Sequence, residues 1–470
     1  MKRSIKTAVV LGAVGALVLP ALPAFAAAKP PKAGQSCKKL GVVVSGLTCT
    51  AVGKKRVYVA AAAPVTTAAP APGATAAPTP AGLAKVPGFD GSTIRVGYLG
   101  NVSVNDQFPA SRSFADGGKA LTAGFNAYIS RVNAAGGVAG KYKVDVDFKE
   151  TYYTPSEAVK AYAEIKNNVV MIGQIYGTPL TQTLVKSLAE DNLVGSPISL
   201  DAAWVKNPNI LPIGATYQGQ VTNVIDWSIK EGGQAGKTFC ALSLANNPFG
   251  DAGEEGFTYA ASKLGFKVGG KFKTSTGPAQ AQQLKAAGCD VVVATISGEA
   301  QMPPLLSETA KLDYFPIILG PSPSFASRSV IPANSVQFGK QVFIAADGSQ
   351  WGDESVAGMK PHMADLRKYA PEQIGNPNPA TEWGYAQAKT VVALLEKAVA
   401  LNDLSKAGMK TALGSLGTVK QDGMYPDWNY GDPASRVAPS SSFIYGVDIS
   451  TPGGLKLIKP WQSEAAKQFK

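Results

Sequence analysis

The feature that most constrains the fold is an alternation of short apolar strands and amphipathic helices, which runs twice along the chain. In the first series, the expected strands are residues 93–100, 141–148, 169–175 and 193–199. A helix is expected over residues 117–132, because Leu121, Phe125 and Tyr128 recur at helical spacing. Strands that alternate with helices form parallel, doubly wound sheets. This series therefore predicts one α/β lobe.

The alternation pauses near residues 213–219 and then starts again. The expected strands of the second series are residues 237–244, 266–273, 290–297 and 315–321. The chain is thus expected to be an α/β protein with two doubly wound, Rossmann-like lobes. Such sheets place ligands at the carboxyl ends of their strands, so we expect a binding site in the crevice between the lobes.

The N-terminal segment has the pattern of an export signal. Lys2, Arg3 and Lys6 precede an apolar run that ends in Ala24-Phe25-Ala26, which predicts a signal peptide over residues 1–26 and an exported protein. No cysteine follows this run directly, so no lipid attachment signal is recognised there. Residues 61–90 are mostly Ala, Pro, Thr and Gly, a composition that predicts a disordered, semi-rigid linker.

The positive charge of the chain is concentrated near its N-terminus. The net charge is +12, yet all acidic residues lie at or after Asp90, and eleven Lys and Arg residues precede it. The remainder is nearly neutral, so we expect no nucleic-acid partner. The basic segment is suited to an anionic cell-wall polymer. A solvated segment that only aids export or solubility is the alternative.

The four cysteines of this exported chain predict two disulfides. Cys37 and Cys49 flank short β-prone runs, so residues 27–60 are expected to form a small basic hairpin module closed by their bond. Cys240 lies in the first expected strand of the second lobe and Cys289 precedes its third. A Cys240–Cys289 bond is expected, and two buried free thiols are the alternative.

Catalytic and cofactor motifs are scarce. The single histidine, His362, is expected to be an exposed side chain of a surface helix. One histidine cannot assemble a histidine-based metal site, and no Gly-x-Ser-x-Gly elbow or Gly-x-Gly-x-x-Gly fingerprint occurs. We therefore expect no cofactor, no metal and no catalytic activity.

The glycine-rich stretch over residues 133–148 superficially resembles a phosphate loop. That loop requires Ser or Thr after its lysine, whereas Tyr142 follows Lys141 here. It also follows a strand and opens a helix, whereas this stretch follows a helix and opens a strand. We expect Gly136 and Gly137 to end the helix and Lys141 to face solvent.

Polar and aromatic residues follow the expected strands of both lobes. The ligand-binding candidates are Phe114, Tyr176, Gly177, Thr178, Ser196, Ser199, Tyr217, Asn247, Phe249, Ser297, Glu299, Ser322, Trp351 and Trp383. Hydroxyls, amides and backbone N–H groups suit a small polar ligand, and aromatic rings can stack on one. The alternative for each polar residue is a cap or turn role, and for each aromatic residue a place in the core.

Several segments together resemble the exported substrate-binding proteins of branched-chain amino acid ABC transporters, which have the type I periplasmic-binding-protein fold. They include "FNAYISRVNAAGGVAGKYKVDVDF", "NNPFGDAGEEGF" and "GPSPSF", and the likeness covers roughly residues 94–460. The resemblance implies a three-strand hinge, hinge closure around a ligand and an ABC permease as partner. We also expect a monomer.

The resemblance also implies how the chain is divided between the lobes. The implied crossovers lie near residues 214–219, 345–348 and 440. Lobe 1 is then formed by residues 91–216 and 347–440, and lobe 2 by residues 217–346 and 441–470.

Three positions depart from the pattern of the amino-acid-binding members. Gly177 stands where such proteins commonly have Ser, Leu200 replaces a Thr that meets the α-carboxylate, and Ser322 replaces the acid that often meets the ammonium. A desolvated ammonium without an acidic partner is costly. The resemblance therefore implies a neutral or weakly polar ligand, such as an amide or an aromatic compound.

The sequence thus predicts an extracellular or cell-envelope solute-binding protein that captures a small polar or amphipathic molecule, whether amino-acid-like, amide or aromatic, for an ABC permease. One alternative is a ligand-sensing receptor component on the same fold. The other is an exported α/β enzyme that uses Asp251, Glu299 or Asp347.

Overall fold

The computed structural model describes residues 32, 35–39, 43–44, 47–52, 54–60, 82–276, 278–326 and 340–469. These residues form two compact units, one on each side of the Ala/Pro-rich segment. The expected signal peptide and most of the expected linker, residues 61–81, lie outside the described residues.

The smaller unit is an antiparallel sheet of three strands. These are β1 (Val43–Val44), β2 (Leu47–Val52) and β3 (Lys55–Ala60), in the order β1-β2-β3. The predicted hairpin is confirmed, because Val44 pairs with Leu47. The predicted Cys37–Cys49 disulfide is also present. A cross-link suits a unit that is too small to hold a large core.

The first sheet of the larger unit is parallel and has the order β5-β4-β6-β7. Its strands are β4 (Thr93–Gly100), β5 (Lys143–Glu150), β6 (Met171–Ile175) and β7 (Gly195–Pro197). The helices between them are α1 (Pro109–Ala134), α2 (Pro155–Ile165) and α3 (Thr178–Glu190). Helix α1 begins eight residues before the expected start, because its first two turns carry few apolar residues and leave no periodic pattern.

A later part of the chain returns to cover this first sheet. It contributes α9 (Met359–Tyr369), α10 (Ala380–Ala400) and α11 (Lys406–Gly414). Helix α10 packs along α1. Their axes approach closely because Gly124 and Gly384 have no Cβ. A Cβ on Gly124 would lie 1.9 Å from the Thr381 carbonyl oxygen, and one on Gly384 would lie 2.0 Å from that of Leu121.

The second sheet is mixed and has the order β16-β15-β12-β11-β10-β8-β9. Its strands are β8 (Thr238–Leu244), β9 (Lys267–Thr274), β10 (Val291–Thr295), β11 (Ile317–Pro321), β12 (Val342–Ala346), β15 (Ser442–Val447) and β16 (Leu455–Trp461). The flanking helices are α4 (Tyr217–Lys230), α5 (Pro248–Leu264), α6 (Pro278–Ala286), α7 (Met302–Lys311) and α12 (Glu464–Gln468). The predicted Cys240–Cys289 disulfide is confirmed, and the free-thiol alternative is wrong.

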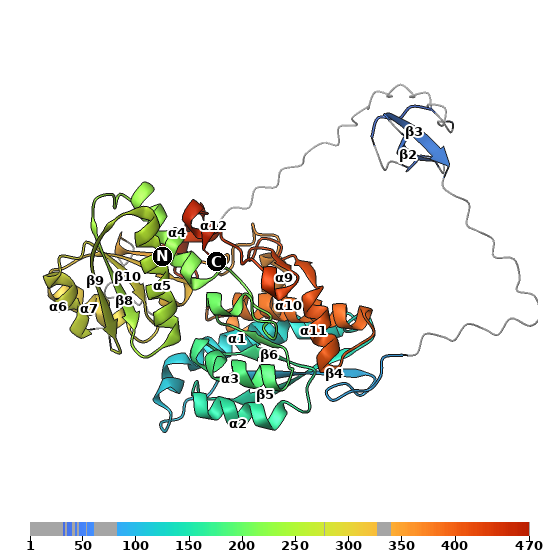
Figure 1. The fold of residues 1–470 in the computed structure, drawn as a ribbon, viewed down its shortest axis with the longest axis horizontal. Coiled ribbons are helices and arrows are strands. Elements are labelled where there is room, and N and C mark those ends of the chain that lie inside the picture. Colours follow the sequence, from blue (N-terminus) through green and yellow to red (C-terminus); the bar gives the residue numbers. More distant parts are fainter. Residues whose placement is uncertain are drawn as a thin grey trace, which may run out of the picture. The chain divides into compact units, whose positions relative to one another are not determined.

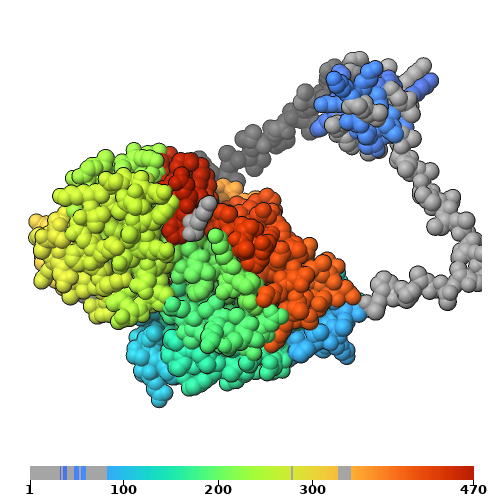
Figure 2. Space-filling view, viewed as in Figure 1, coloured from blue at the N-terminus to red at the C-terminus, as the bar shows by residue number. Residues whose placement is uncertain are grey.

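The chain crosses between the two sheets three times: after β7, after β12, and after the small sheet of β13 (Gly417–Val419) and β14 (Trp428–Tyr430). Figure 1 shows the two lobes as separate α/β layers, and Figure 2 shows them as two rounded masses in contact. Hydrogen bonds tie the crossovers together: the Trp428 indole donates to the Gly214 carbonyl at 2.8 Å. The described 3₁₀ helices are η1 (Ala202–Trp204), η2 (Ser322–Ser324), η4 (Pro371–Gln373) and η5 (Pro433–Ser435).

The glycine-rich stretch after α1 is a turn, as predicted. Gly136 and Gly137 have φ values of 110° and 91°, in the left-handed region that glycine adopts at little cost. Lys141 is exposed, and its ammonium lies 5.0 Å from the centre of the Tyr142 ring. The chain then enters β5, so this stretch reverses the direction of the chain between the helix and the second strand of the first βαβ unit.

The prediction that His362 is an exposed side chain is wrong. Its side chain is fully buried on the inner face of α9, beside the ring of Tyr385 at 4.9 Å between centroids. Met359, Met363 and Leu366 share that face, at the spacing of an amphipathic helix that packs against the first lobe. Burial lowers the pKa of His362 to about 3, which keeps the imidazole neutral.

Candidate functional site

A cavity with an empty volume of about 990 Å³, including space open to solvent, lies at the carboxyl ends of strands from both sheets. The first lobe contributes the N-terminal half of α1, the loops after β5 and β6, and the start of α10. The second lobe contributes the residues that follow β8, β10 and β11. Asp347 adds a group from the crossover after β12. This is where parallel sheets with crossover helices hold their ligands.

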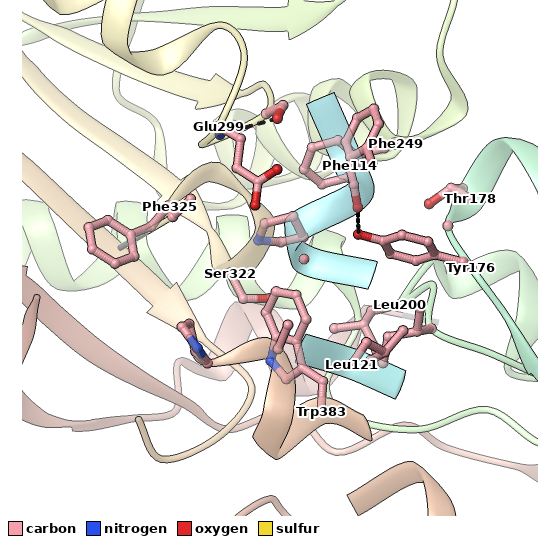
Figure 3. Close-up of a pocket in the computed structure, with 18 of the residues that line it drawn as sticks. Phe114, Leu121, Tyr176, Thr178, Leu200, Phe249, Glu299, Ser322, Phe325 and Trp383 are labelled. Atoms are coloured by element: carbon pink, nitrogen blue, oxygen red, sulfur yellow. Dashed lines mark hydrogen bonds between the residues drawn. The ribbon is translucent and has the colours of Figure 1, made fainter. Parts of the chain in front are cut away.

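One side of the cavity is an aromatic wall, made of Phe114, Tyr153 and Tyr176 (Figure 3 labels the first and last). The rings of Phe114 and Tyr153 stack at 3.9 Å between centroids, and Tyr153 meets Tyr176 edge-on at 5.2 Å. The Tyr176 hydroxyl donates to the Phe114 carbonyl oxygen at 3.2 Å. Stacking and this hydrogen bond fix the three rings relative to one another. The wall is therefore a preformed apolar surface.

Gly177 is required by this wall. Its φ is 93°, and a Cβ there would lie 2.4 Å from the Tyr153 hydroxyl oxygen. Any other residue would be strained and would displace the Tyr153 ring. The departure from Ser at this position thus has a local physical reason.

Thr178 is held from behind the cavity surface. The Ser199 hydroxyl donates to Thr178 Oγ1 at 2.8 Å and accepts from the Trp204 indole N–H at 2.8 Å. Ser199 is buried and does not line the cavity. It positions Thr178, which lines the cavity, and does not itself reach the ligand space.

Two candidates of the second lobe line the cavity and also cap local structure. Asn247 Oδ1 accepts from the Phe249 N–H at 3.0 Å and caps α5. Ser297 Oγ accepts from the Glu299 and Ala300 N–H groups at 3.3 and 3.2 Å. Their side chains are thus already engaged in the backbone hydrogen bonds expected of caps. Nearby, Tyr217 and Phe249 meet edge-on at 4.8 Å between centroids.

A second part of the cavity lining, the unpaired group, comprises Ser322, Asp347 and Trp383. Ser322 Oγ, Asp347 Oδ1 and Trp383 Nε1 are buried and have no hydrogen-bond partner within the described part of the chain. Ser322 and Asp347 follow adjacent parallel strands, since Pro321 of β11 pairs with Ala345 of β12. Figure 3 shows Ser322 near the middle of the view and Trp383 below it, whereas Tyr176 and Thr178 lie at the right.

Burial controls the ionisation of Asp347. Its side chain is 1% exposed, and desolvation raises its pKa to about 7. The Ser322 hydroxyl is close enough to oppose this shift, but it makes no hydrogen bond of ordinary geometry with the carboxyl. Asp347 is therefore a carboxyl that exists in both protonation states near neutral pH.

Most of the candidates predicted from the sequence surround this cavity. Those that line it are Phe114, Tyr176, Gly177, Thr178, Tyr217, Asn247, Phe249, Ser297, Glu299, Ser322 and Trp383. Ser196, Ser199 and Trp351 lie elsewhere. Ser196 donates to the Leu211 carbonyl oxygen in the first lobe, and Trp351 packs in the apolar cluster around His362.

Of the three carboxylates named for the enzyme alternative, two line the cavity and one does not. Asp347 and Glu299 line the cavity. Asp251 lies outside it, on the exposed side of α5, where it pairs with Lys273 at 2.8 Å. Among the residues that the structure describes, no cluster of His, Cys, Asp and Glu is arranged to hold a metal ion.

Other lining residues were not predicted from the sequence. They are Gly117, Leu121, Tyr153, Ile198, Leu200, Leu244, Pro323, Phe325, Ala326, Asn378, Pro379 and Ala380, and Asp347 was named only for the enzyme alternative. Tyr153 follows Tyr152, and both have positive φ, at 52° and 49°. Two aromatic residues beside a predicted strand end are the signal that could have drawn attention to this loop.

Comparisons with known proteins agree on the fold. A family model described as periplasmic binding protein matches residues 93–450. No curated protein matches the chain. Within the described residues, the helices are too short or too polar to cross a membrane.

Solved structures with sequence identities below 25% support the fold alone. A fatty acid ABC transporter substrate-binding protein from Thermomonospora curvata is 23% identical, covers 83% of this chain and 97% of its own, and has a TM-score of 0.73. A branched chain amino acid ABC transporter from Thermus thermophilus with bound valine is 15% identical, with coverages of 80% and 98% and a TM-score of 0.65. A solute binding protein from R. palustris in complex with 4-hydroxybenzoate is 16% identical, with coverages of 79% and 98% and a TM-score of 0.65.

The family match spans both lobes, and the structural matches extend over nearly the whole length of those proteins. The two sheets, the three crossovers and the cavity between the lobes are consistent with them. The chain therefore belongs to the periplasmic binding protein family, with the type I fold of ABC-transporter substrate-binding proteins.

Proposed function

We propose that the protein captures a small amphipathic molecule in the cavity between its lobes and delivers it to an ABC permease. The observation that carries this proposal is an aromatic cavity at the carboxyl ends of both sheets, beside a crossover of the chain. Binding is proposed to draw the lobes together by rotation at the three crossovers, and the permease then recognises the closed form.

The lining favours a ligand with an apolar or aromatic body and a small polar end. Aromatic and aliphatic side chains surround most of the space, and the described residues that line it include no Lys, Arg or His. An amide or aromatic compound suits such a lining, as does an amino-acid-like molecule of low polarity. The ligands named for the solved relatives are chemically diverse, so they do not select among these classes.

A thermal-shift screen tests this function. The purified protein is heated with amino acids, amides, polyamines, short peptides, fatty acids and aromatic acids. A ligand present at 100 times its dissociation constant stabilises the folded state by about 2.7 kcal/mol, which gives a clear rise in Tm. If no compound raised Tm, the solute-binding proposal would be refuted. Turnover of a bound compound would instead favour the enzyme alternative.

We also propose that the smaller unit binds an anionic cell-wall polymer. Its basic residues Lys38, Lys39, Lys54, Lys55 and Arg56 are all exposed. Such a concentration of positive charge attracts polyanions, and the attraction weakens as salt is added.

Deleting residues 27–87 should shift the protein from the cell envelope to the culture medium. A matched variant that keeps the fold replaces Lys38, Lys39, Lys54 and Lys55 with Gln. If the retention is electrostatic, this variant is also released. Unchanged association of both variants with the cells would refute the proposal.

A further inference from the structure

The unpaired group presents an unusual combination of polar atoms. Asp347 Oδ1 can accept a hydrogen bond when the carboxyl is ionised, the Trp383 indole N–H can only donate, and the Ser322 hydroxyl can do either. All three residues line the cavity. A buried polar atom without a partner costs about 1–3 kcal/mol, so atoms of this kind are normally satisfied by a ligand or a water molecule.

The surroundings hold Ser322 and Asp347 in place. The other oxygen of Asp347, Oδ2, lies beside Gly214 of the first crossover, where a Cβ would approach it to 2.4 Å. The Ser322 backbone N–H is already used, since it donates to Gln220 Oε1 at 2.9 Å. Ser322 and Asp347 are thus fixed where lobe 2 passes into the crossover, with one polar atom each left over.

The three simplest polar head groups differ in how well they fit. An ammonium group only donates, so it leaves the Trp383 N–H unsatisfied. A carboxylate only accepts and is repelled by ionised Asp347. A primary carboxamide donates through its N–H groups and accepts through its carbonyl oxygen. It alone satisfies an acceptor and a donor at once, without a net charge to desolvate.

We infer that Ser322, Asp347 and Trp383 form a subsite for a primary carboxamide, whose N–H donates to Asp347 while its carbonyl oxygen accepts from Trp383 and Ser322. This inference rests on the proposed solute-binding function and narrows it to uncharged amides with an apolar body. The body of the ligand lies against the aromatic wall of Phe114, Tyr153 and Tyr176.

Two matched ligand series test the subsite by isothermal titration calorimetry of the full chain at pH 8. The first is phenylacetamide, phenethylamine and phenylacetate, and the second is hexanamide, hexylamine and hexanoate. In whichever series binds, the amide is expected to bind at least about tenfold more tightly than the amine and the acid, because each of these leaves a buried group unsatisfied.

The outcomes separate the subsite from the function on which it rests. Tighter binding of an acid or an amine would overturn the carboxamide subsite but leave solute binding intact. Absence of binding in both series would also overturn the subsite. Only if the broad thermal-shift screen failed as well would solute binding itself be refuted.

Variants assign the effect to individual atoms. D347N should lower the amide-to-acid affinity ratio at least about tenfold, because it removes the charge that repels the acid. W383F should lower the amide-to-amine affinity ratio, because only the amide uses the indole N–H and the amine no longer leaves that N–H unsatisfied. The control is D353N, an exposed carboxylate outside the cavity that should leave all affinities unchanged.

Thermal unfolding is measured first to confirm that each variant is folded. If D347N or W383F weakened all head groups equally, these residues would have only a structural role and the subsite would be refuted.

Discussion

The aromatic wall and the unpaired group face the same cavity, but they differ in how completely their polar atoms are satisfied. In the wall, the Tyr176 hydroxyl donates to the Phe114 carbonyl oxygen and the rings pack on one another. In the unpaired group, Ser322 Oγ and Asp347 Oδ1 have no partner among the described residues. One part of the site is complete without a ligand, whereas the other is not.

This difference suggests a division of labour in recognition. A preformed apolar wall lowers the entropy lost on binding, but it discriminates poorly between ligands of similar shape. Buried polar atoms discriminate strongly, because a wrong head group leaves them unsatisfied. We therefore expect changes to the wall to weaken binding of all ligands and changes to the unpaired group to alter selectivity.

The largest effect on stability is expected for Gly177→Ala, which disturbs the packing of the aromatic wall. The new Cβ would lie 2.4 Å from the Tyr153 hydroxyl oxygen, at a φ of 93°. We expect a loss of about 4 kcal/mol in the free energy of unfolding, roughly 1 from the backbone and about 3 from displacement of the ring. Chemical denaturation measures this loss, and the affinities for all head groups should fall together.

Gly140→Ala is the matched control for this substitution. Gly140 also has a positive φ, 68°, but nothing lies within 4 Å of a Cβ placed there. It should cost only about 1 kcal/mol, the backbone contribution alone. Equal losses for the two variants would mean that the Tyr153 ring is not rigidly placed.

A smaller effect on the free energy of unfolding is expected from ionisation of Asp347 in the unpaired group. The pKa of Asp347 is raised to about 7 in the folded protein, so between about pH 4 and pH 7 the folded state binds more protons than the unfolded state. Its contribution to stability therefore falls as pH rises through this window. From pH 5 to pH 8 the wild type should lose about 3 kcal/mol more than D347N, measured by denaturant unfolding at each pH.

Comparison with D347N removes the contributions of other buried groups. Burial raises the pKa of Glu382 to about 8, so its contribution to the free energy of unfolding also falls as pH rises. His362, with a lowered pKa, opposes folding only in acid. Both are the same in the two proteins, as are Tyr217, Tyr425 and Tyr445 near Asp347. Parallel pH profiles would show that Asp347 is not desolvated as the structure indicates.

The lobes could be predicted from the sequence because their signals are local. Most strands of the two sheets are short apolar or alternating runs, and most helices have one apolar face. The prediction was wrong at His362 because the polarity of the imidazole was given more weight than the pattern of Met359, Met363 and Leu366, which indicated the buried face. Periodicity was the better guide there.

The site was only partly predictable, for a physical reason. Thr178 and Asn247 follow strands directly, so the sheets determine their positions. Tyr153 and Asp347 lie in a loop and a crossover, whose positions depend on how distant segments pack. The resemblance to the amino-acid-binding members implies that an acid is missing at Ser322. It does not show that Asp347, at the end of the adjacent strand, supplies a carboxyl beside it.

The smallest effect is expected for Ser199→Ala, which acts behind Thr178 of the cavity lining. This change removes the hydroxyl that donates to Thr178 and leaves the buried Trp204 N–H without its acceptor. We expect a loss of about 1–2 kcal/mol in stability, whereas Ser262→Ala on the exposed surface of α5 should change it by less than about 0.5. Because Ser199 does not line the cavity, the ratio of affinities for amide, amine and acid should stay constant. A change in that ratio, measured by calorimetry, would mean that selectivity also depends on residues behind the cavity lining, and the division between the wall and the unpaired group would no longer hold.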